Sequence, residues 1–193
     1  MLSAGVAGNI FASPPSSSIL AAIRALSAHN PAGILVIVFN YTGTIFSINF
    51  LIWFVFSGDR INFGIAVEKA KREGMKVMFC SHYCSISCTM MQVEMLVNGE
   101  DCALSSSDKS AGRRGLCGTM FLFKILGAMA ERGDRLELVA AAGRELSSCM
   151  GTMGLALAPC SLPGQLAPLF IVEPGKLELG LGVHGEAGVV SHY

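Results

Sequence analysis

Residues 34–43, ILVIVFNYTG, give the clearest indication of the fold of this chain. Residues 34–39 are apolar and rich in Ile and Val, which is typical of a strand buried in a parallel sheet. The NYTG tetrapeptide at 40–43 has the composition of a turn. The stretch therefore predicts a buried strand that ends in a polar turn. In open α/β sheets, ligands bind beyond the carboxyl ends of such strands.

The flanking sequence alternates between helical and strand-like patterns. Ser18 is the expected N-cap of a helix over 19–26, because its hydroxyl can accept a hydrogen bond from a free N–H of the first turn. Apolar residues at helical spacing predict a further helix from Ile61 to the basic residues before Gly74. The other expected elements are a strand over 93–97, a polar loop over 98–115, helices over 119–132 and 135–146, and short strands over 155–158 and 177–181. This alternation predicts an α/β domain with a mainly parallel sheet and flanking helices.

Composition excludes several classes of protein. The 193 residues are 52% hydrophobic and 15% charged, against about 25% charged residues in a typical domain, which excludes intrinsic disorder. The formal net charge of +0 offers no electrostatic basis for binding nucleic acid or an anionic membrane. Seven cysteines without paired spacing favour reduced thiols, and no Lys or Arg precedes Arg24 to begin a signal peptide. We therefore expect a cytoplasmic protein.

An uncharged run over 34–56 has the length of a membrane-spanning helix. The turn residues of NYTG lie near its middle, and its first part fits a buried strand better. A membrane anchor near 34–56 therefore remains an alternative, but a membrane is not the expected partner.

Two blocks, 44–58 and 78–92, differ in composition from the sequence around them. The first, TIFSINFLIWFVFSG, holds the only Trp and four of the eleven Phe. The second, MFCSHYCSISCTMMQ, holds three of the seven Cys and one His. Zinc ligands usually come from two separate chain segments, so this cluster predicts thiols in an unusual insertion rather than a metal site.

Gly180, Gly182 and Gly185 formally match the dinucleotide-binding pattern G-x-G-x-x-G. That pattern requires a helix directly after it, and the eight residues after Gly185 show no helical periodicity. No dinucleotide cofactor is therefore expected.

His184 is the candidate catalytic residue. It lies in the glycine-flanked turn VHGEAG, directly after the apolar strand LELGLG, where small neighbours leave the imidazole accessible and Glu186 could orient it. A neutral imidazole nitrogen is a competent nucleophile toward a carbonyl carbon. A surface or core histidine without special function is the alternative.

Asp59 is the candidate substrate-binding residue. It lies beside the NYTG turn only if the block over 44–58 is looped out. A carboxylate at that place could accept hydrogen bonds from a polyol or act as a base. The alternative is a helix N-cap, because Asp59 precedes a helical pattern.

Arg113 and Arg114 form the adjacent cationic pair of the sequence AGRRG. The pair could bind an anion, and a solvated loop pair is the alternative.

Six motifs, taken in order, resemble the dihydroxyacetone kinase family. They are FASP (11–14), NYTG (40–43), GDRINFG (58–64), EDCAL (100–104), AGRRGLCGT (111–119) and LELGLGVHGEAG (177–188). The resemblance implies that residues 1–193 are the first half of the α/β substrate-binding domain, with insertions at 44–58 and 78–92.

The resemblance also implies a function, which is ATP-dependent phosphorylation of dihydroxyacetone (glycerone) or glyceraldehyde, a glycerone kinase or triokinase activity. His184 corresponds to the family histidine that forms a covalent hemiaminal with the triose carbonyl, and Asp59 corresponds to the substrate-binding Asp. ATP and magnesium belong to a separate helical domain of the family. Family members form homodimers, and full-length proteins can also cleave FAD to cyclic FMN, an FAD-AMP lyase activity.

The departures from the family pattern suggest an incomplete kinase. The family motif GGGSGHEP is absent, Phe39 stands where Lys is frequent, and Thr44 replaces the Asp that should follow Gly43. Excising both blocks restores the family pattern, so we interpret them as translated introns or gene-model errors. Activity of this chain alone is doubtful, and an inactive carbonyl-binding relic is the alternative.

Overall fold

The computed structural model describes most of the chain. The described residues are 2–30, 32–41, 58–78, 92–103, 112–161, 164, 167–168, 171–182, 188 and 190–192. Most of both unusual blocks, together with the VHGEA sequence at 183–187, lies outside them.

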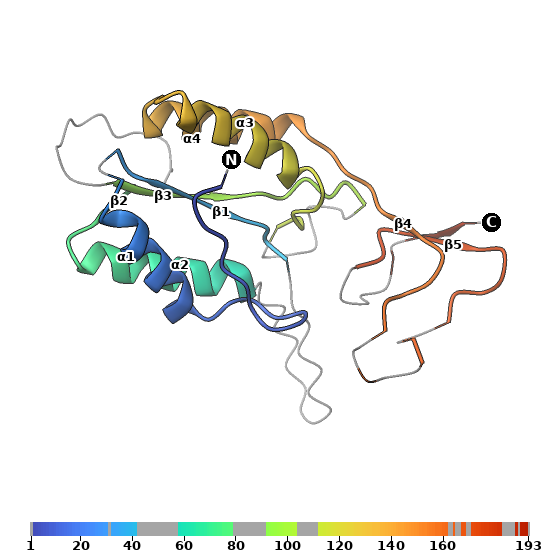
Figure 1. The fold of residues 1–193 in the computed structure, drawn as a ribbon. Coiled ribbons are helices and arrows are strands. Elements are labelled where there is room, and N and C mark those ends of the chain that lie inside the picture. The colour runs from blue at the N-terminus through green and yellow to red at the C-terminus, as the bar shows by residue number, and fades with distance from the viewer. Residues whose placement is uncertain are drawn as a thin grey trace.

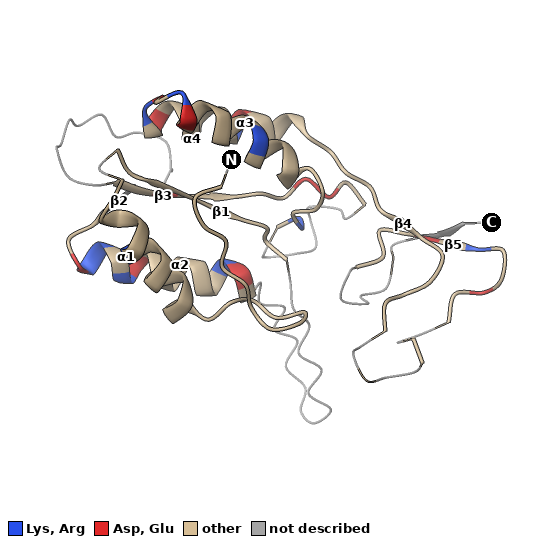
Figure 2. Ribbon diagram, viewed as in Figure 1, with Lys and Arg blue, Asp and Glu red and all other residues tan. Residues whose placement is uncertain are grey.

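A parallel sheet forms the centre of the molecule (Figure 1). Its strands are β1 (Ile34–Val38), β2 (Lys76–Met78) and β3 (Gln92–Val97), in the order β1-β3-β2. The pairing of β1 with β3 runs from Ile34 opposite Val93 to Val38 opposite Val97. The α/β class with a mainly parallel sheet is therefore confirmed. Charged residues lie mainly on helices and connecting loops, whereas β1 carries none (Figure 2).

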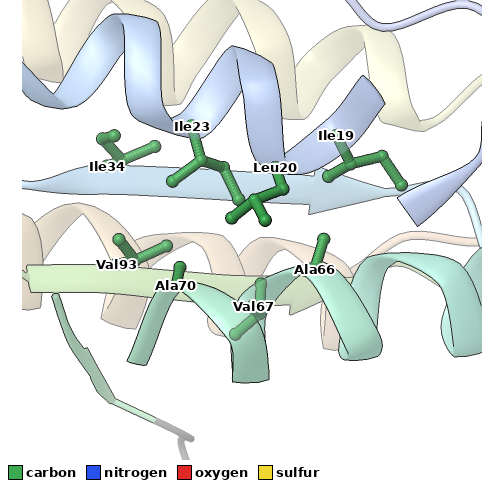
Figure 3. Close-up of a cluster of buried hydrophobic side chains, with 8 residues drawn as sticks. All are labelled: Ile19, Leu20, Ile23, Ile34, Ala66, Val67, Ala70 and Val93. Atoms are coloured by element: carbon green, nitrogen blue, oxygen red, sulfur yellow. The ribbon is translucent and has the colours of Figure 1, made fainter. Parts of the chain in front are cut away.

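Two pairs of helices cover the two faces of the sheet (Figure 1). The pair on one face is α1 (Ser16–Ser27) and α2 (Gly58–Arg72), and the pair on the other is α3 (Thr119–Glu131) and α4 (Leu136–Cys149). Figure 3 shows the core on the first face, where α1, α2, β1 and β3 contribute Ile19, Leu20, Ile23, Ile34, Ala66, Val67, Ala70 and Val93. All eight are buried, which removes their apolar surface from water and stabilises this packing.

A second, antiparallel sheet follows α4 in the chain. It consists of β4 (Leu155–Ala156), β5 (Leu177–Leu179) and β6 (Val190–His192), in that order. The strands β4 and β5 are shorter than expected, and β6 was not expected. Three-residue strands such as β6 are held by pairing with a neighbour and leave little periodic signal in the sequence.

Helix starts differ from the predictions. Ser18 is not an N-cap, because α1 begins at Ser16 and the extended Pro15 occupies the capping position without a side-chain hydrogen bond. The Pro15 carbonyl instead accepts hydrogen bonds from the N–H groups of Ser18 and Ile19 at 3.0 and 3.2 Å. The C-terminal end of α2 follows the prediction, since Gly74 has a φ of 86° and ends the helix in the left-handed conformation that glycine tolerates.

The apolar run over 34–56 begins as a strand rather than as a helix, since residues Ile34–Val38 form β1. None of the helices built by the described residues is both long enough and apolar enough to cross a bilayer. The remainder of the run, from residue 42, lies outside the described residues.

Strand β2 was not predicted, and its last residue, Met78, is the first residue of the second block. It pairs in parallel with β3, so that Val77 lies opposite Val93 and Met78 opposite Glu94. Adjacent parallel strands need a connection of about a dozen residues or more, and residues 79–91 provide it. If residues 78–92 were removed, Val77 would join Val93 directly, and β2 would become the beginning of β3.

Candidate functional site

Polar residues gather where β1 and β3 end. Asn40 and Tyr41 follow β1, and Asn98, Glu100 and Asp101 follow β3. The exposed fraction is 3% for Asn40 and 0% for each of the three residues after β3. Asn98 and Glu100 lie outside helices and strands, as the prediction of a polar loop over 98–115 requires. Their side chains are nevertheless buried, and they hydrogen-bond to each other and to the backbone in the interior.

Glu100 holds the N-terminal end of α3. Its Oε1 accepts hydrogen bonds from the N–H groups of Leu116 and Gly118 at 2.7 and 2.9 Å, and its Oε2 accepts one from Asn98 Nδ2 at 2.7 Å. The first N–H groups of a helix lack partners within the helix and attract a negative charge. A Cβ at position 118 would lie 2.7 Å from Glu100 Cγ, so the close approach requires glycine there.

Arg114 joins the end of β3 to the second sheet. Its Nε donates to Asp101 Oδ2 at 2.7 Å, its Nη2 donates to the Gly180 carbonyl at 2.8 Å, and its guanidinium lies 5.6 Å from the centre of the Tyr41 ring. The side chains of Arg114 and Asp101 are 4% and 0% exposed. The alternative of a solvated arginine pair is thus wrong for Arg114, whereas its neighbour Arg113 is exposed.

Asp59 lies at the same edge of the sheet. Its Oδ2 accepts a hydrogen bond from the backbone N–H of Tyr41 at 3.0 Å, although 18 positions separate the two residues. Asp59 is the second residue of α2, so it belongs to the first helical turn rather than preceding the helix as an N-cap. Within the described residues, Oδ2 is the oxygen of Asp59 for which the structure gives a hydrogen bond.

His184 lies outside the described residues, but the segments on both sides of it are described. On one side, the Gly180 carbonyl binds Arg114, and the Gly180 N–H donates to the Gly154 carbonyl at 2.8 Å. On the other side, the Gly188 N–H donates to Glu178 Oε2 at 2.8 Å. The described residues on the two sides of 183–187 are thus held in place, Gly180 by Arg114 and Gly188 by Glu178.

The described part of the chain offers no cluster of three His, Cys, Asp or Glu side chains that could hold a metal ion. Cys80, His82, Cys84 and Cys88 of the second block lie outside that part. The four described cysteines, Cys102, Cys117, Cys149 and Cys160, are free thiols.

Sequence reasoning missed the buried residues Asn98, Glu100 and Asp101. They follow a buried strand directly, as Asn40 follows the first strand, and this position was a usable signal. It was hidden because most residues from 98 to 115 are polar or glycine, and a hydrophilic run does not reveal which of its side chains are enclosed.

Comparison with known proteins identifies the family. A model of the Dak1 domain matches residues 1–52 and 49–192. The chain belongs to the Dak1 domain family. The two matched ranges of this Dak1 chain meet inside the first block, at 49–52.

Curated relatives of this Dak1 chain are kinases or kinase subunits. It is 43% identical to rat triokinase/FMN cyclase over 98% of its own length. It is 45% identical to a putative 3,4-dihydroxy-2-butanone kinase of tomato over 97% of its length. It is 36% identical, again over 97% of its length, to the dihydroxyacetone-binding subunit of a PTS-dependent dihydroxyacetone kinase of Listeria innocua. The alignments cover 27%, 26% and 47% of those proteins. The chain thus spans about a quarter of the two longer relatives and about half of the bacterial subunit.

Solved structures share the fold. The dihydroxyacetone kinase of Citrobacter freundii superposes with a TM-score of 0.70 at 36% identity, covering 94% of this chain and 27% of that one, and it has also been solved with AMP-PNP and Mg²⁺. The dihydroxyacetone kinase operon co-activator DhaQ superposes with a TM-score of 0.69 at 27% identity, covering 93% of this chain and 45% of that one. The resemblance to the dihydroxyacetone kinase family and to its substrate-domain fold is confirmed.

Proposed function

We propose that this chain forms the first part of a triose-binding kinase domain and captures dihydroxyacetone or glyceraldehyde through His184. One observation carries the proposal. The Asp59 carboxylate and the Gly180 strand end reach the same edge of the parallel sheet, through Tyr41 and Arg114 respectively. Residues far apart in the sequence thereby approach the position where open α/β sheets bind ligands.

The proposed chemistry is addition without a leaving group. The unprotonated imidazole nitrogen of His184 attacks the triose carbonyl carbon, the C=O π electrons move to the oxygen, and the proton of the other ring nitrogen is transferred to that oxygen. The product is a neutral hemiaminal. Asp59 Oδ1 accepts a hydrogen bond from a triose hydroxyl and orients the substrate. Glycerol has no carbonyl and is not captured.

Phosphorylation would need more than these residues. As the family resemblance implies, we infer that magnesium and ATP are held by parts of the family's proteins that this chain does not span, since it covers 27% of rat triokinase/FMN cyclase. The triose kinase activity, the FAD-AMP lyase activity, the homodimer and the cytoplasmic location are proposals for such an assembled protein.

The His184→Ala variant is expected to lose the covalent triose. We expect dihydroxyacetone labelled with ¹³C at C2 to give a protein-bound tetrahedral carbon, coupled through one bond to ¹⁵N in protein with labelled histidine. This coupling separates the hemiaminal from free hydrated triose, whose C2 is also tetrahedral. The measurement is ¹³C–¹⁵N correlation NMR on the full chain.

His29→Ala is the matched control, because His29 is an exposed histidine just after α1 and should leave the coupling unchanged. A wild-type chain without coupling, or an undiminished coupling in His184→Ala, would contradict the proposed capture.

We also propose that 44–58 and 78–92 are insertions into the Dak1 domain. The hydrogen bond from Tyr41 to Asp59 brings the two ends of the first block together, and the family match divides within this block. At the second block, Val77 lies beside Val93 in parallel register. Removing residues 78–92 would join these two residues into one continuous strand. Spliced transcripts that lack both blocks would support the proposal, and transcripts that retain them would contradict it.

Deleting residues 44–58 is expected to stabilise the chain by about 1.5 kcal/mol. The loop closed by the Tyr41–Asp59 contact shortens from 18 to three positions, which lowers the entropy cost of closing it. Urea denaturation of the deletion variant measures the change. Replacing the block with a Gly/Ser linker of equal length is the control and should recover little of the gain. A deletion variant that unfolds at lower urea than the wild type would refute the insertion.

A second candidate function is binding without phosphorylation. It is favoured by the structural similarity to DhaQ, a co-activator of a dihydroxyacetone kinase operon. In both candidate functions His184 captures the triose, and the two differ in whether the triose is then phosphorylated. Phosphorylation of dihydroxyacetone after addition of a family ATP-binding domain supports the kinase, whereas triose capture without turnover supports the binding module.

A further inference from the structure

Asn40 lies at the point where the chain leaves β1 for the candidate site. The Val38 carbonyl accepts a hydrogen bond from the Asn98 N–H at 2.9 Å, and the next carbonyl, that of Phe39, accepts one from the Gly115 N–H. The backbone hydrogen bonding of β1 therefore continues through residue 39. Asn40 then has a φ of 51°, a left-handed conformation that is uncommon for residues other than glycine. The chain turns out of the sheet at this residue.

The side chain of Asn40 is held by the loop before α3. Its Nδ2 donates to the Arg113 carbonyl at 2.6 Å across 73 positions of the sequence, and the residue is 3% exposed. The loop is itself fixed directly after that contact, because the Arg114 carbonyl accepts a hydrogen bond from the Asp101 N–H at 3.0 Å and Gly115 binds the end of β1. A buried side chain bonded to a fixed backbone group keeps the turn in one conformation.

The turn at Asn40 directs the next backbone N–H to the candidate site. The Tyr41 N–H donates to Asp59 Oδ2 at 3.0 Å. In a parallel sheet the N–H groups of a strand point sideways to neighbouring strands, whereas α2, which carries Asp59, covers a face of the sheet (Figure 1). An extended residue at position 40 would therefore turn the Tyr41 N–H towards a neighbouring strand and away from Asp59.

We propose that Asn40 is a positioning residue for triose binding. Its anchored left-handed turn orients the Asp59 carboxylate through the Tyr41 N–H, and Asn40 acts without touching the substrate. This inference rests on the proposed role of Asp59 in binding a triose hydroxyl. Sparsely populated backbone conformations persist where the surrounding structure fixes them, and they cluster at ligand sites that are preorganised. A carboxylate that is already oriented loses less conformational freedom when the ligand binds.

The Asn40→Gly variant removes the anchor and leaves the backbone free to turn. Glycine adopts a left-handed φ without steric cost, so the variant loses the hydrogen bond to the Arg113 carbonyl but meets no barrier to the turn. We expect the full chain with this substitution to bind dihydroxyacetone about tenfold more weakly than the wild type, because a carboxylate without a fixed orientation makes a poorer charge-assisted hydrogen bond. Titration followed by ¹H–¹⁵N NMR measures the dissociation constant.

A second measurement reports the orientation of Asp59 directly. We expect a scalar coupling across the hydrogen bond between Tyr41 ¹⁵N and Asp59 ¹³Cγ in the wild type, and a smaller coupling in Asn40→Gly. Asn40→Asp is a second variant, which keeps the size of the side chain and the tolerance of a left-handed φ but presents an acceptor to the Arg113 carbonyl. It should show the same two losses.

Asn30→Gly is the matched control. Asn30 Nδ2 also donates to a backbone carbonyl, that of Leu26 at 2.7 Å, but Asn30 precedes β1, whereas Asn40 follows it. Both glycine variants should unfold at lower urea than the wild type, and only Asn40→Gly should lose coupling and triose affinity. Equal triose affinities in the two variants would show a purely structural role and overturn the inference, and so would a coupling that is undiminished in Asn40→Gly.

Asp59→Ala separates this inference from the proposed function. If Asp59→Ala binds dihydroxyacetone more weakly than the wild type while Asn40→Gly binds it equally well, the positioning role of Asn40 is refuted and the role of Asp59 stands. If the wild type binds no dihydroxyacetone, or if Asp59→Ala binds it unchanged, the proposed binding role of Asp59 fails and the positioning role fails with it.

Discussion

The Arg114→Leu variant is expected to lose about 3–5 kcal/mol of free energy of unfolding, because it leaves a buried carboxylate without its cation. Asp101 is fully buried and its Oδ2 binds Arg114 Nε at 2.7 Å. The variant also removes the hydrogen bond to the Gly180 carbonyl. One substitution therefore breaks a buried ion pair and a contact between the two sheets.

Urea denaturation measures this loss of free energy of unfolding, and the Arg113→Leu variant is the control. Arg113 is the adjacent residue and its side chain is exposed, so its substitution should change stability by no more than about 0.5 kcal/mol. The double variant Asp101→Asn/Arg114→Leu should recover part of the loss, since it removes the unpaired charge while Asn can still accept from the Ala103 N–H. If Arg114→Leu were as mild as Arg113→Leu, the buried pair would not hold the edge of the sheet.

The Glu100→Ala variant is expected to lose about 3–5 kcal/mol. It removes the acceptor of the Leu116 and Gly118 N–H groups and of Asn98 Nδ2, and each buried donor without a partner costs about 1–3 kcal/mol. It also removes the negative charge at the first turn of α3, where the helix dipole favours it. We expect denaturation of the whole α/β unit at lower urea.

Glu100→Gln separates the carboxylate from the volume of the side chain. The remaining carbonyl oxygen can still accept from Leu116 and Gly118, whereas the amide places a donor opposite Asn98 Nδ2. We expect a smaller loss, about 1–2 kcal/mol. Equal losses of free energy of unfolding in the Ala and Gln variants would mean that the charge-assisted hydrogen bonds, rather than the volume of the side chain, account for the whole effect. Small losses in both variants would contradict the role of Glu100.

Most regular elements could be predicted from local pattern. The strands near 34 and 93 and the helices near 19, 61, 119 and 136 are long or strongly apolar, so their periodicity is clear in the sequence. Boundaries were less predictable, because α1 starts from the Pro15 carbonyl rather than from the Ser18 hydroxyl. The strands β2 and β6 are held by pairing with neighbours, and three residues are too few to show a period.

The candidate site was predicted in part. Asp59 was expected at the end of the first strand if the first block looped out, and its contact with the Tyr41 N–H puts it there. The role of His184 and the binding role of Asp59 stay predictions. The buried network of Asn98, Glu100 and Asp101 could not be derived, because burial of a polar residue depends on which distant segments close over it.

The α/β class, the order of the main helices and strands, and the family resemblance follow from the amino-acid sequence alone, because these depend on apolar periodicity and on short contiguous motifs. The three-dimensional fold was needed to show that Arg114 is enclosed while its neighbour Arg113 is exposed. The physical reason is that charge and hydrogen-bonding capacity belong to a residue type, whereas desolvation and proximity arise only when the chain folds.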